Sequence, residues 1–431
     1  MATLSAGKVA EVLFENVLET YEEQTQMMDL VDTFKPDSAA MQNAGNFIWR
    51  PKQQHAPIIE GFDLTNQETE IIEETYPAVL GEPKNDFVKQ RVDDLRDMGF
   101  WERRGKQSGM QQATELNRSV AQMVATTGSI FFRSDATSGY DFISEAQAIL
   151  NERQNIKTDM RHFVLNDRSV QAYSKDLAAR QTLQGRPEES WVTGQIGSNV
   201  AEFDVHTGSY LPNLAGGASP DTTATGDQSF IPEGGSVNAV TGVVTNVDYR
   251  EAAIVVADTS GYNIGDKVTI GAIQSVGLAD KNPTNELMTF SIVAIADGTN
   301  MTIFPKPIAF SERPVADGGD GTLTAAQAAC SNVDVPIINT NVVARLNIDA
   351  SAKVNIFWCK DSIEITSGDA PLQLLAEFDG MKVVSSTLKS GQNMYMAYDG
   401  NLAELTFRFR IFTWYGVTNA NPSANGVGIR F

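Results

Sequence analysis

The residues that could bind a metal or carry acid-base chemistry are few, and their spacing fits none of the common catalytic motifs. The three histidines, His55, His162 and His206, stand far apart in the sequence, and none belongs to an HExxH motif or a Cys/His ligand set. The chain also lacks a GxSxG elbow, a P-loop and a dinucleotide-binding fingerprint. We therefore expect no metal site, no cofactor and no enzymatic activity.

Acidic clusters and cysteines are the other candidates for chemistry. The Asp/Gly run at 317–321 resembles a calcium loop in composition, but it occurs once, and a flexible turn explains it. The paired acids at 73–74 and 93–94 could act as acid and base, yet adjacent helical residues face different ways, which favours solvated faces. Cys330 and Cys359 are too few for a disulfide framework and lack CxxC spacing, so we expect free thiols.

Length and composition indicate a globular, acidic protein of about three domains. Of the 431 residues, 42% are hydrophobic, which is enough to fill a sizeable core. The 54 acidic and 33 basic side chains give a net charge of -21, which argues against a dedicated nucleic-acid-binding protein. No run reaches the roughly 20 apolar residues of a membrane helix, and no secretory pattern opens the chain. We therefore expect no membrane association, and we expect synthesis and folding to take place in the cytoplasm.

The elements that would position functional residues begin with an amphipathic helix near the N-terminus. Apolar residues recur there at i, i+3 and i+4: Ala10, Leu13, Phe14, Val17, Leu18 and Tyr21. Glu11, Glu15 and Glu19 gather on the opposite side, followed by further acids at 22–23. Two interpretations stay open: the helix docks on its own domain with its acids in water, or it presents a negative strip to a basic partner.

Residues 41–83 have the pattern of an extended, polar segment that short groups of hydrophobic residues interrupt, as in Glu68-Thr69-Glu70-Ile71-Ile72-Glu73-Glu74. Such an arm has little core of its own and usually lies on a neighbour. We predict that its apolar residues are buried against neighbouring subunits: Phe47, Ile48, Trp49, Ile58 and Ile59.

A long charged tract that follows this arm predicts a helix from Asn85 to Val124, with a stop at residues 126–128. Glycines at 99, 105 and 109 each cost about 1 kcal/mol in a helix interior, so we expect its first half to be bent or frayed. Further helices are predicted at 141–152 and 169–183. The predicted strands of the C-terminal part are 342–348, 353–358, 362–366 and 405–415.

Residues 225–335 have the pattern of a small β domain inserted into a chain of different character. Strand-like runs at 253–257, 267–273, 288–294 and 300–304 are separated by Gly- and Pro-containing turns. The even spacing predicts a barrel or sandwich, and the two ends of an insertion should lie close together.

Several of these stretches carry a resemblance to a known family. The chain is similar to the major capsid (coat) proteins of short-tailed bacteriophages of the Salmonella phage P-twenty-two type. The matching stretches run in order from about residue 45 to the C-terminus: Gly81-Glu82-Pro83-x-Asn85-Asp86-Phe87, Arg91-x-Asp93-Asp94-Leu95-Arg96-Asp97, Gly265-Asp266-Lys267, Thr289-Phe290-Ser291-x-Val293, Asp297-Gly298-Thr299, Pro305-Lys306-Pro307, Asn355-x-Phe357-Trp358, Trp414-Tyr415-Gly416-Val417 and Gly426-Val427-Gly428.

The resemblance implies an α+β fold, the Hong Kong-ninety-seven-type phage capsid fold with an inserted six-stranded β-barrel domain. The implied parts are an N-terminal arm (1–40), an extended loop (41–80), a peripheral domain with a spine helix (81–128), an axial domain (129–222 and 341–395), the inserted barrel (223–340) and peripheral-domain strands with the C-terminus (396–431). Relatives carry an Asp-rich loop early in the insertion, whereas residues 237–247 here are nearly uncharged. The contact made by that loop is therefore not carried over.

The implied function is that of a coat protein. It would self-assemble with a scaffolding protein into an icosahedral procapsid of hexamers and pentamers, which matures into the virion shell around double-stranded DNA. A portal protein is a further implied partner, and Glu11, Glu15 and Glu19 would meet the scaffolding protein. An acidic wall would not bind the DNA it encloses, although acidity also serves solubility. A phage tail or adhesin-type protein is the alternative, and an enzyme such as a polysaccharide lyase comes third.

Overall fold

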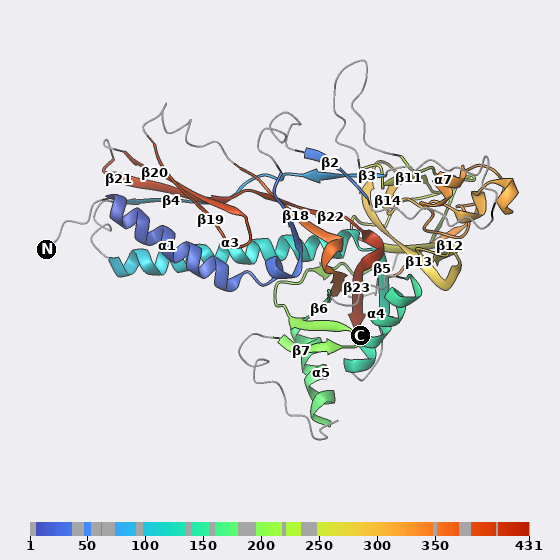
Figure 1. Cartoon of the computed structure of the whole chain (residues 1–431), viewed down its shortest axis with the longest axis horizontal. Helices are drawn as coiled ribbons and strands as arrows, with labels where there is room; N and C mark the ends of the chain where they lie inside the picture. Colours follow the sequence, from blue (N-terminus) through green and yellow to red (C-terminus); the bar gives the residue numbers. More distant parts are fainter. Residues whose placement is uncertain are drawn as a thin grey trace, which may run out of the picture. The chain divides into compact units, whose positions relative to one another are not determined.

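The computed structural model describes residues 6–36, 47–52, 62, 74–91, 98–134, 139–154, 160–179, 195–217, 221–233, 248–347, 351–369, 381–401 and 404–430 (Figure 1). The chain divides into two units, each built from separate stretches. The first unit holds Met1–Ile48, Ala78–Val120 and Glu364–Thr418. The second unit holds Trp49–Pro77, Ala121–Ile363 and Asn419–Phe431. Among the residues listed here, no helix is both long enough and apolar enough to cross a membrane.

An antiparallel four-stranded sheet is the centre of the first unit. Its order is β19 (Lys382–Thr387), β20 (Asn393–Asn401), β21 (Thr406–Thr413) and β4 (Lys84–Arg91). One face of the sheet packs against α3 (Met98–Thr127), where the buried Trp101 ring lies 5.5 Å from Phe409 and 6.4 Å from Phe407. Large buried aromatic side chains of this kind contribute strongly to a core.

The prediction of a helix beginning at Asn85 is wrong for residues 85–91. These residues form strand β4, which pairs with β21 from Lys84↔Thr413 to Arg91↔Thr406. The side chains of β4 alternate between half-buried and exposed along its whole length. Because charged and polar residues occupy both faces of this edge strand, its period of two is not visible as an alternation of hydrophobicity.

Helix α3 is continuous from Met98 to Thr127, so its first half is not frayed. Its glycines serve close packing instead. A Cβ atom on Gly105 would lie 2.8 Å from the carbonyl oxygen of Leu13, and one on Gly109 would lie 2.6 Å from that of Val17. Both oxygens belong to α1 (Ala6–Gln24), the amphipathic helix expected from the sequence. The glycines therefore let the two helices approach closely.

A short three-stranded sheet follows the N-terminal helix. Its order is β1 (Asp32–Phe34), β18 (Ile363–Ser367) and β22 (Tyr415–Asn419). The 3-10 turn at Met27–Leu30 leads into it, and the backbone N–H of Met27 donates to the Asn117 side chain of α3 at 3.1 Å. The N-terminal segment is thus tied to elements far away in sequence.

A six-stranded mixed sheet lies in the second unit. Its order is β5 (Ile130–Ser134), β23 (Asn425–Arg430), β17 (Asn355–Cys359), β6 (Arg161–Leu165), β8 (Phe203–Thr207) and β7 (Gln195–Val200). Helices α4 (Gly139–Glu152) and α5 (Asp167–Ala179) confirm the two predicted helices, and each begins two residues earlier than predicted. The predicted residues 180–183 lie outside the described residues. Aromatic rings dominate the core between α4 and the sheet: Phe132, Phe142, Phe163, Phe203 and Phe357. A small two-stranded sheet joins β9 (Asn213–Leu214) to β16 (Ala352–Lys353).

The inserted β segment forms a second six-stranded sheet in this unit. Its order is β10 (Thr222–Thr223), β15 (Val342–Arg345), β12 (Lys267–Val276), β13 (Pro283–Ile295), β14 (Asn300–Phe304) and β11 (Ala252–Val255). All four strands predicted inside the insertion are confirmed; the ends of three are shifted, and β14 has the predicted bounds. Thr222 pairs with Val343, so the two ends of the insertion are adjacent, as expected.

The inserted sheet is curled, and its two outer segments share backbone hydrogen bonds. The N–H of Thr225 donates to the carbonyl of Val255 at 2.9 Å, and the N–H of Ala257 donates to that of Thr223 at 2.9 Å. Seventeen buried residues form a single cluster under the sheet, and all of them lie between Ala224 and Val343. Among the described residues, the hydrophobic core of the insertion therefore consists of the insertion's own side chains.

Candidate assembly surfaces

The acidic face of α1 is exposed, as the sequence predicts. Leu13 and Val17 are fully buried on the opposite face, whereas Glu11, Glu15 and Glu19 are exposed. The end of the helix is held in place by Glu22, which pairs with Lys389 at 3.1 Å. Three carboxylates spaced four residues apart lie on one side of a helix, so α1 presents a negative strip to its surroundings.

A shallow surface groove of about 390 Å³ adjoins this strip between α1 and α3. Glu19 and Glu23 line it from α1, and Lys106 and the half-exposed Met110 line it from α3. The groove therefore has two carboxylates and one lysine among mainly polar lining residues, with Met110 as its one apolar side chain.

The stem of the extended segment is well defined. Strands β2 (Phe47–Pro51) and β3 (Thr75–Val79) form a two-stranded sheet. Beyond it the backbone N–H of Lys52 donates to the carbonyl of Glu74 at 2.7 Å, and the Lys52 ammonium pairs with the Glu74 carboxylate at 2.6 Å. The side chain of Glu74 is largely buried, so this ion pair fixes the base from which residues 53–73 depart.

Of the five apolar residues predicted at intersubunit contacts, the structure describes the side chains of two. Ile48 and Trp49 lie in β2 and are half-buried; the Trp49 ring is 5.7 Å from that of Tyr249 in the same chain. Phe47 begins β2, and its side chain lies outside the described residues, as do Ile58 and Ile59 entirely. The structure therefore gives Trp49 a partner within its own subunit, and burial of the five residues against a neighbour stays a prediction.

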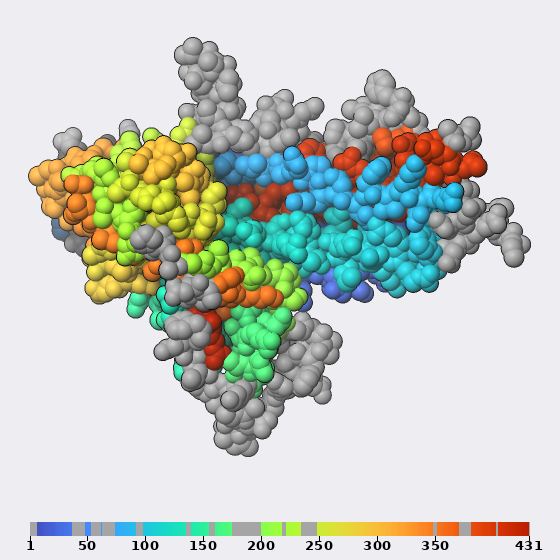
Figure 2. Space-filling view, turned by 180° about the vertical axis from the view of Figure 1, so that it is seen from behind, coloured from blue at the N-terminus to red at the C-terminus, as the bar shows by residue number. Residues whose placement is uncertain are grey.

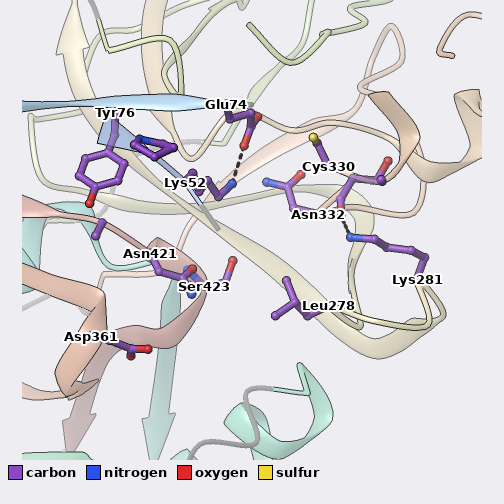
Figure 3. A pocket seen from close by; sticks show the side chains of 14 residues that line it. Lys52, Glu74, Tyr76, Leu278, Lys281, Cys330, Asn332, Asp361, Asn421 and Ser423 are labelled. Carbon is purple, nitrogen blue, oxygen red and sulfur yellow. Dashed lines mark hydrogen bonds and ion pairs between the residues drawn. The ribbon is translucent and has the colours of Figure 1, made fainter. Parts of the chain in front are cut away.

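A polar cavity of about 340 Å³ lies beside this stem (Figure 3). Its lining includes Lys52 and Glu74 from the stem, Lys281 and Cys330 from the insertion, and Asp361. Burial raises the pKa of the Cys330 thiol to about 11, so the thiol is protonated at neutral pH and is a poor nucleophile. Burial also lowers the pKa of Lys281 to about 8, and its ammonium donates to the Ser331 carbonyl at 3.0 Å. These contacts hold the cavity wall together.

A buried lysine, Lys267, joins the insertion to the end of the long helix. Its ammonium donates to the carbonyl of Gly128 at 2.9 Å and to the hydroxyl of Ser291 at 2.5 Å. Gly128 follows the last turn of α3, where carbonyl groups lack helical partners and a cation is favourable. Burial lowers the pKa of Lys267 to about 7. Lys267 belongs to one of the stretches that carry the family resemblance, Gly265-Asp266-Lys267. Nothing in that stretch predicts a hydrogen bond to the distant Gly128 carbonyl.

Two of the three histidines are far apart in the sequence but are neighbours in the six-stranded mixed sheet of the second unit. His162 on β6 and His206 on β8 have ring centroids 6.0 Å apart. Burial is the main cause that lowers the pKa of both, and that of His162 falls to about 4. Among the described residues no group of three or more His, Cys, Asp or Glu side chains is arranged to hold a metal ion.

Acidification is expected to weaken the second unit through His162. In the folded chain His162 stays neutral down to about pH 4, whereas an unfolded histidine binds a proton below about pH 6.5. The free energy of unfolding should therefore fall between pH 6.5 and 4, by about 3 kcal/mol from this residue. Urea titrations of the parent and of His162→Gln at several pH values measure it. Identical pH dependence in both proteins would contradict this account.

A family model and several solved structures are similar to this chain. A family model described as "P22 coat protein - gene protein 5" matches residues 1–430. A solved structure titled "Mycobacterium phage Che8" is 10% identical, covering 94% of this chain and 90% of that one, with a TM-score of 0.39. The "Asymmetric unit of bacteriophage PhiM1 mature capsid" is 8% identical, covering 93% and 85%, with a TM-score of 0.42. The "CUS-3 coat protein I-domain" is 27% identical, covering 30% and 99%, with a TM-score of 0.22.

The assignment rests on the family match, because the TM-scores of these structures are low. That match spans the acidic helix, the long helix α3, the inserted sheet and the last strand. It agrees with the resemblance carried by the stretches between residue 45 and the C-terminus. The chain therefore belongs to the P22 coat protein family and is a bacteriophage capsid protein.

Proposed function

We propose that this chain assembles with a scaffolding protein into an icosahedral procapsid of hexamers and pentamers, which matures into the shell around double-stranded DNA. The observation that carries the proposal is the family match over residues 1–430. The net charge of -21 suits an inner wall that does not bind its DNA contents. In this role the chain catalyses no reaction, and a portal protein is a further partner during assembly in the host cytoplasm.

The parts of the chain take the roles that the resemblance implies. The arm (1–40), the extended loop (41–80) and the spine-helix region (81–128) provide contacts between subunits. The axial segments (129–222 and 341–395) surround capsomer centres, and residues 396–431 complete the peripheral domain. We propose that the insertion, expected at 223–340, forms a closed six-stranded barrel that runs from β10 to β15 and so extends to Arg345. The bonds from Thr225 to Val255 and from Ala257 to Thr223 support this closure.

The acidic strip of α1 is proposed to bind the scaffolding protein. Its exposed carboxylates need no partner for the fold, since the opposite face of the helix supplies the buried contacts. Exposed ion pairs are individually weak, about 0 to 1 kcal/mol each, which suits a partner that leaves once the shell is built.

Reversing the charges of Glu15 and Glu19 to Lys should abolish scaffold-directed assembly while the monomer stays folded. High salt should have the same effect on the parent, because exposed charges are screened within about 10 Å at 0.1 M salt. Sedimentation of coat protein mixed with scaffolding protein measures the yield of shells, and circular dichroism checks the monomer.

The matched control is the double reversal Asp317→Lys and Asp320→Lys, which makes the same change in net charge at two exposed residues of the insertion. This control should assemble with the scaffolding protein like the parent. Normal assembly of the Glu15/Glu19 variant at low salt would show that the strip is only a solvated face.

A further inference from the structure

Two buried cations of the insertion, which is largely yellow to orange in Figure 2, bind the rest of the second unit, here called the host. The ammonium of the fully buried Lys267 donates to the carbonyl of Gly128 at 2.9 Å. The guanidinium of Arg250, which is 5% exposed, pairs with Asp248 of the insertion and donates to the carbonyl of Asn419 in the host. Buried cations are costly unless hydrogen bonds satisfy them. Both side chains therefore favour the one placement of the insertion that brings them to these carbonyls.

The two host segments that supply the carbonyls are joined to each other. Gly128 stands before β5 and Asn419 stands before β23, and these two strands are parallel neighbours in the mixed sheet. The backbone N–H of Ser129 donates to the carbonyl of Pro422 at 3.3 Å, and the Asn419 side chain donates to the Thr127 hydroxyl at 2.9 Å. The host thus fixes the positions of both acceptor carbonyls.

A second group of contacts lies at the end of α4. The backbone N–H of Leu278 donates to the carbonyl of Arg153 at 3.3 Å. The side-chain carbonyl of Gln154 accepts from the backbone N–H groups of Ala279 and Asp280 at 2.9 and 3.2 Å. The two bonds to Gln154 are exposed to solvent, and hydrogen bonds are stronger in a buried, low-dielectric place. The buried cations are therefore the stronger determinants of position.

We propose that Arg250 and Lys267 are positioning residues that hold the insertion in one orientation on the host, and that shell assembly requires this orientation. One contact would allow rotation about itself, whereas two directional contacts to fixed acceptors restrict it. Among the described residues, the buried cluster of the insertion and the cluster under α4 share no member, so neither forms a common core. The role in assembly rests on the proposed function, but the orientation can be measured on the monomer.

The distance between two spin labels reports the orientation directly. One label is attached at Ala148→Cys, an exposed position of α4, and the other at Val255→Cys, which is 39% exposed on β11. Cys330→Ser removes the half-buried native thiol, and Cys359 is buried and stays unlabelled. Pulsed electron paramagnetic resonance of the full chain then gives the distribution of distances between insertion and host, which should be narrow in the parent.

The test variant combines Arg250→Met with Lys267→Met. Its distance distribution should be at least about twice as broad as the parent's. Its yield of shells with the scaffolding protein should fall at least about tenfold, because contacts with several neighbours need a defined geometry. The matched control is Arg313→Met, since Arg313 donates to the Phe310 and Asp317 carbonyls inside the insertion. The control should resemble the parent in both measurements.

Hydrogen exchange of the β12–β13 ladder checks that the insertion itself stays folded, and it should equal the parent's. If the double variant does not fold, Lys267→Met alone takes its place, with Arg250→Lys as the variant that keeps its cation and the narrow distribution. An unchanged width in the test variant, or faster exchange in the ladder, overturns the positioning role. A broad distribution with normal shell yield overturns the role in assembly. A parent that forms no shells overturns the proposed function, whereas a broadened distribution in the monomer would still support the positioning role.

Discussion

Replacing residues 53–73 by an Asn-Gly turn is expected to abolish shell formation while leaving the monomer folded. Lys52 and Glu74 already face each other at the end of the β2–β3 stem, with a backbone hydrogen bond of 2.7 Å and an ion pair of 2.6 Å. A two-residue turn can therefore join them with little change to the stem. The variant loses Ile58 and Ile59, whose burial against a neighbour would contribute roughly 1.5 to 3 kcal/mol each. Sedimentation of assembly mixtures measures the loss.

A linker of Gly and Ser with the same length as residues 53–73 is the matched control for this replacement. It restores the reach of the loop without its apolar and acidic side chains, so it should fail to assemble as well. Shells from the Asn-Gly variant would show that the extended loop is dispensable, whereas shells from the linker variant alone would show that only its length matters.

Residues 221–346 expressed alone should fold cooperatively into a β domain. The seventeen residues of its buried cluster all come from this stretch, and its first and last strands, β10 and β15, pair with each other. Phe290 is fully buried in that cluster. Replacing it by alanine should lower the free energy of unfolding by about 3 to 5 kcal/mol. Urea unfolding followed by circular dichroism measures both.

Val315→Ala is the control for Phe290→Ala, because Val315 is 69% exposed and its truncation should change the unfolding free energy by about 0.5 kcal/mol or less. A random-coil spectrum of the isolated segment would contradict independent folding. Equal stabilities of Phe290→Ala and the parent segment would contradict the position of Phe290 in the core.

The elements predicted correctly from the sequence are those in which local pattern and burial agree. The acidic helix has one apolar and one charged side, and α1 buries the apolar one. The strands of the insertion lie between turns, and β14 has the predicted bounds, Asn300–Phe304. β4 was missed because an edge strand with polar residues on both faces has no hydrophobic alternation.

Contacts between residues far apart in the chain could not be predicted from the sequence. No local pattern links Lys267 to the carbonyl of Gly128, or brings His162 beside His206. The position of Arg410 opposite Phe87 also depends on strand register, because it follows only from the pairing of β4 with β21. Helix propensity alone makes the glycines of α3 unfavourable, whereas close packing against α1 explains Gly105 and Gly109.

Electron microscopy of the purified chain mixed with its scaffolding protein tests the central claim most directly. Closed shells of uniform diameter with five-fold and six-fold capsomers, in which each subunit fits both units described here, are the predicted result. Monomers or irregular aggregates alone, at concentrations and salt conditions where both proteins are folded and soluble, would contradict the assignment of this chain as the protein that builds the shell.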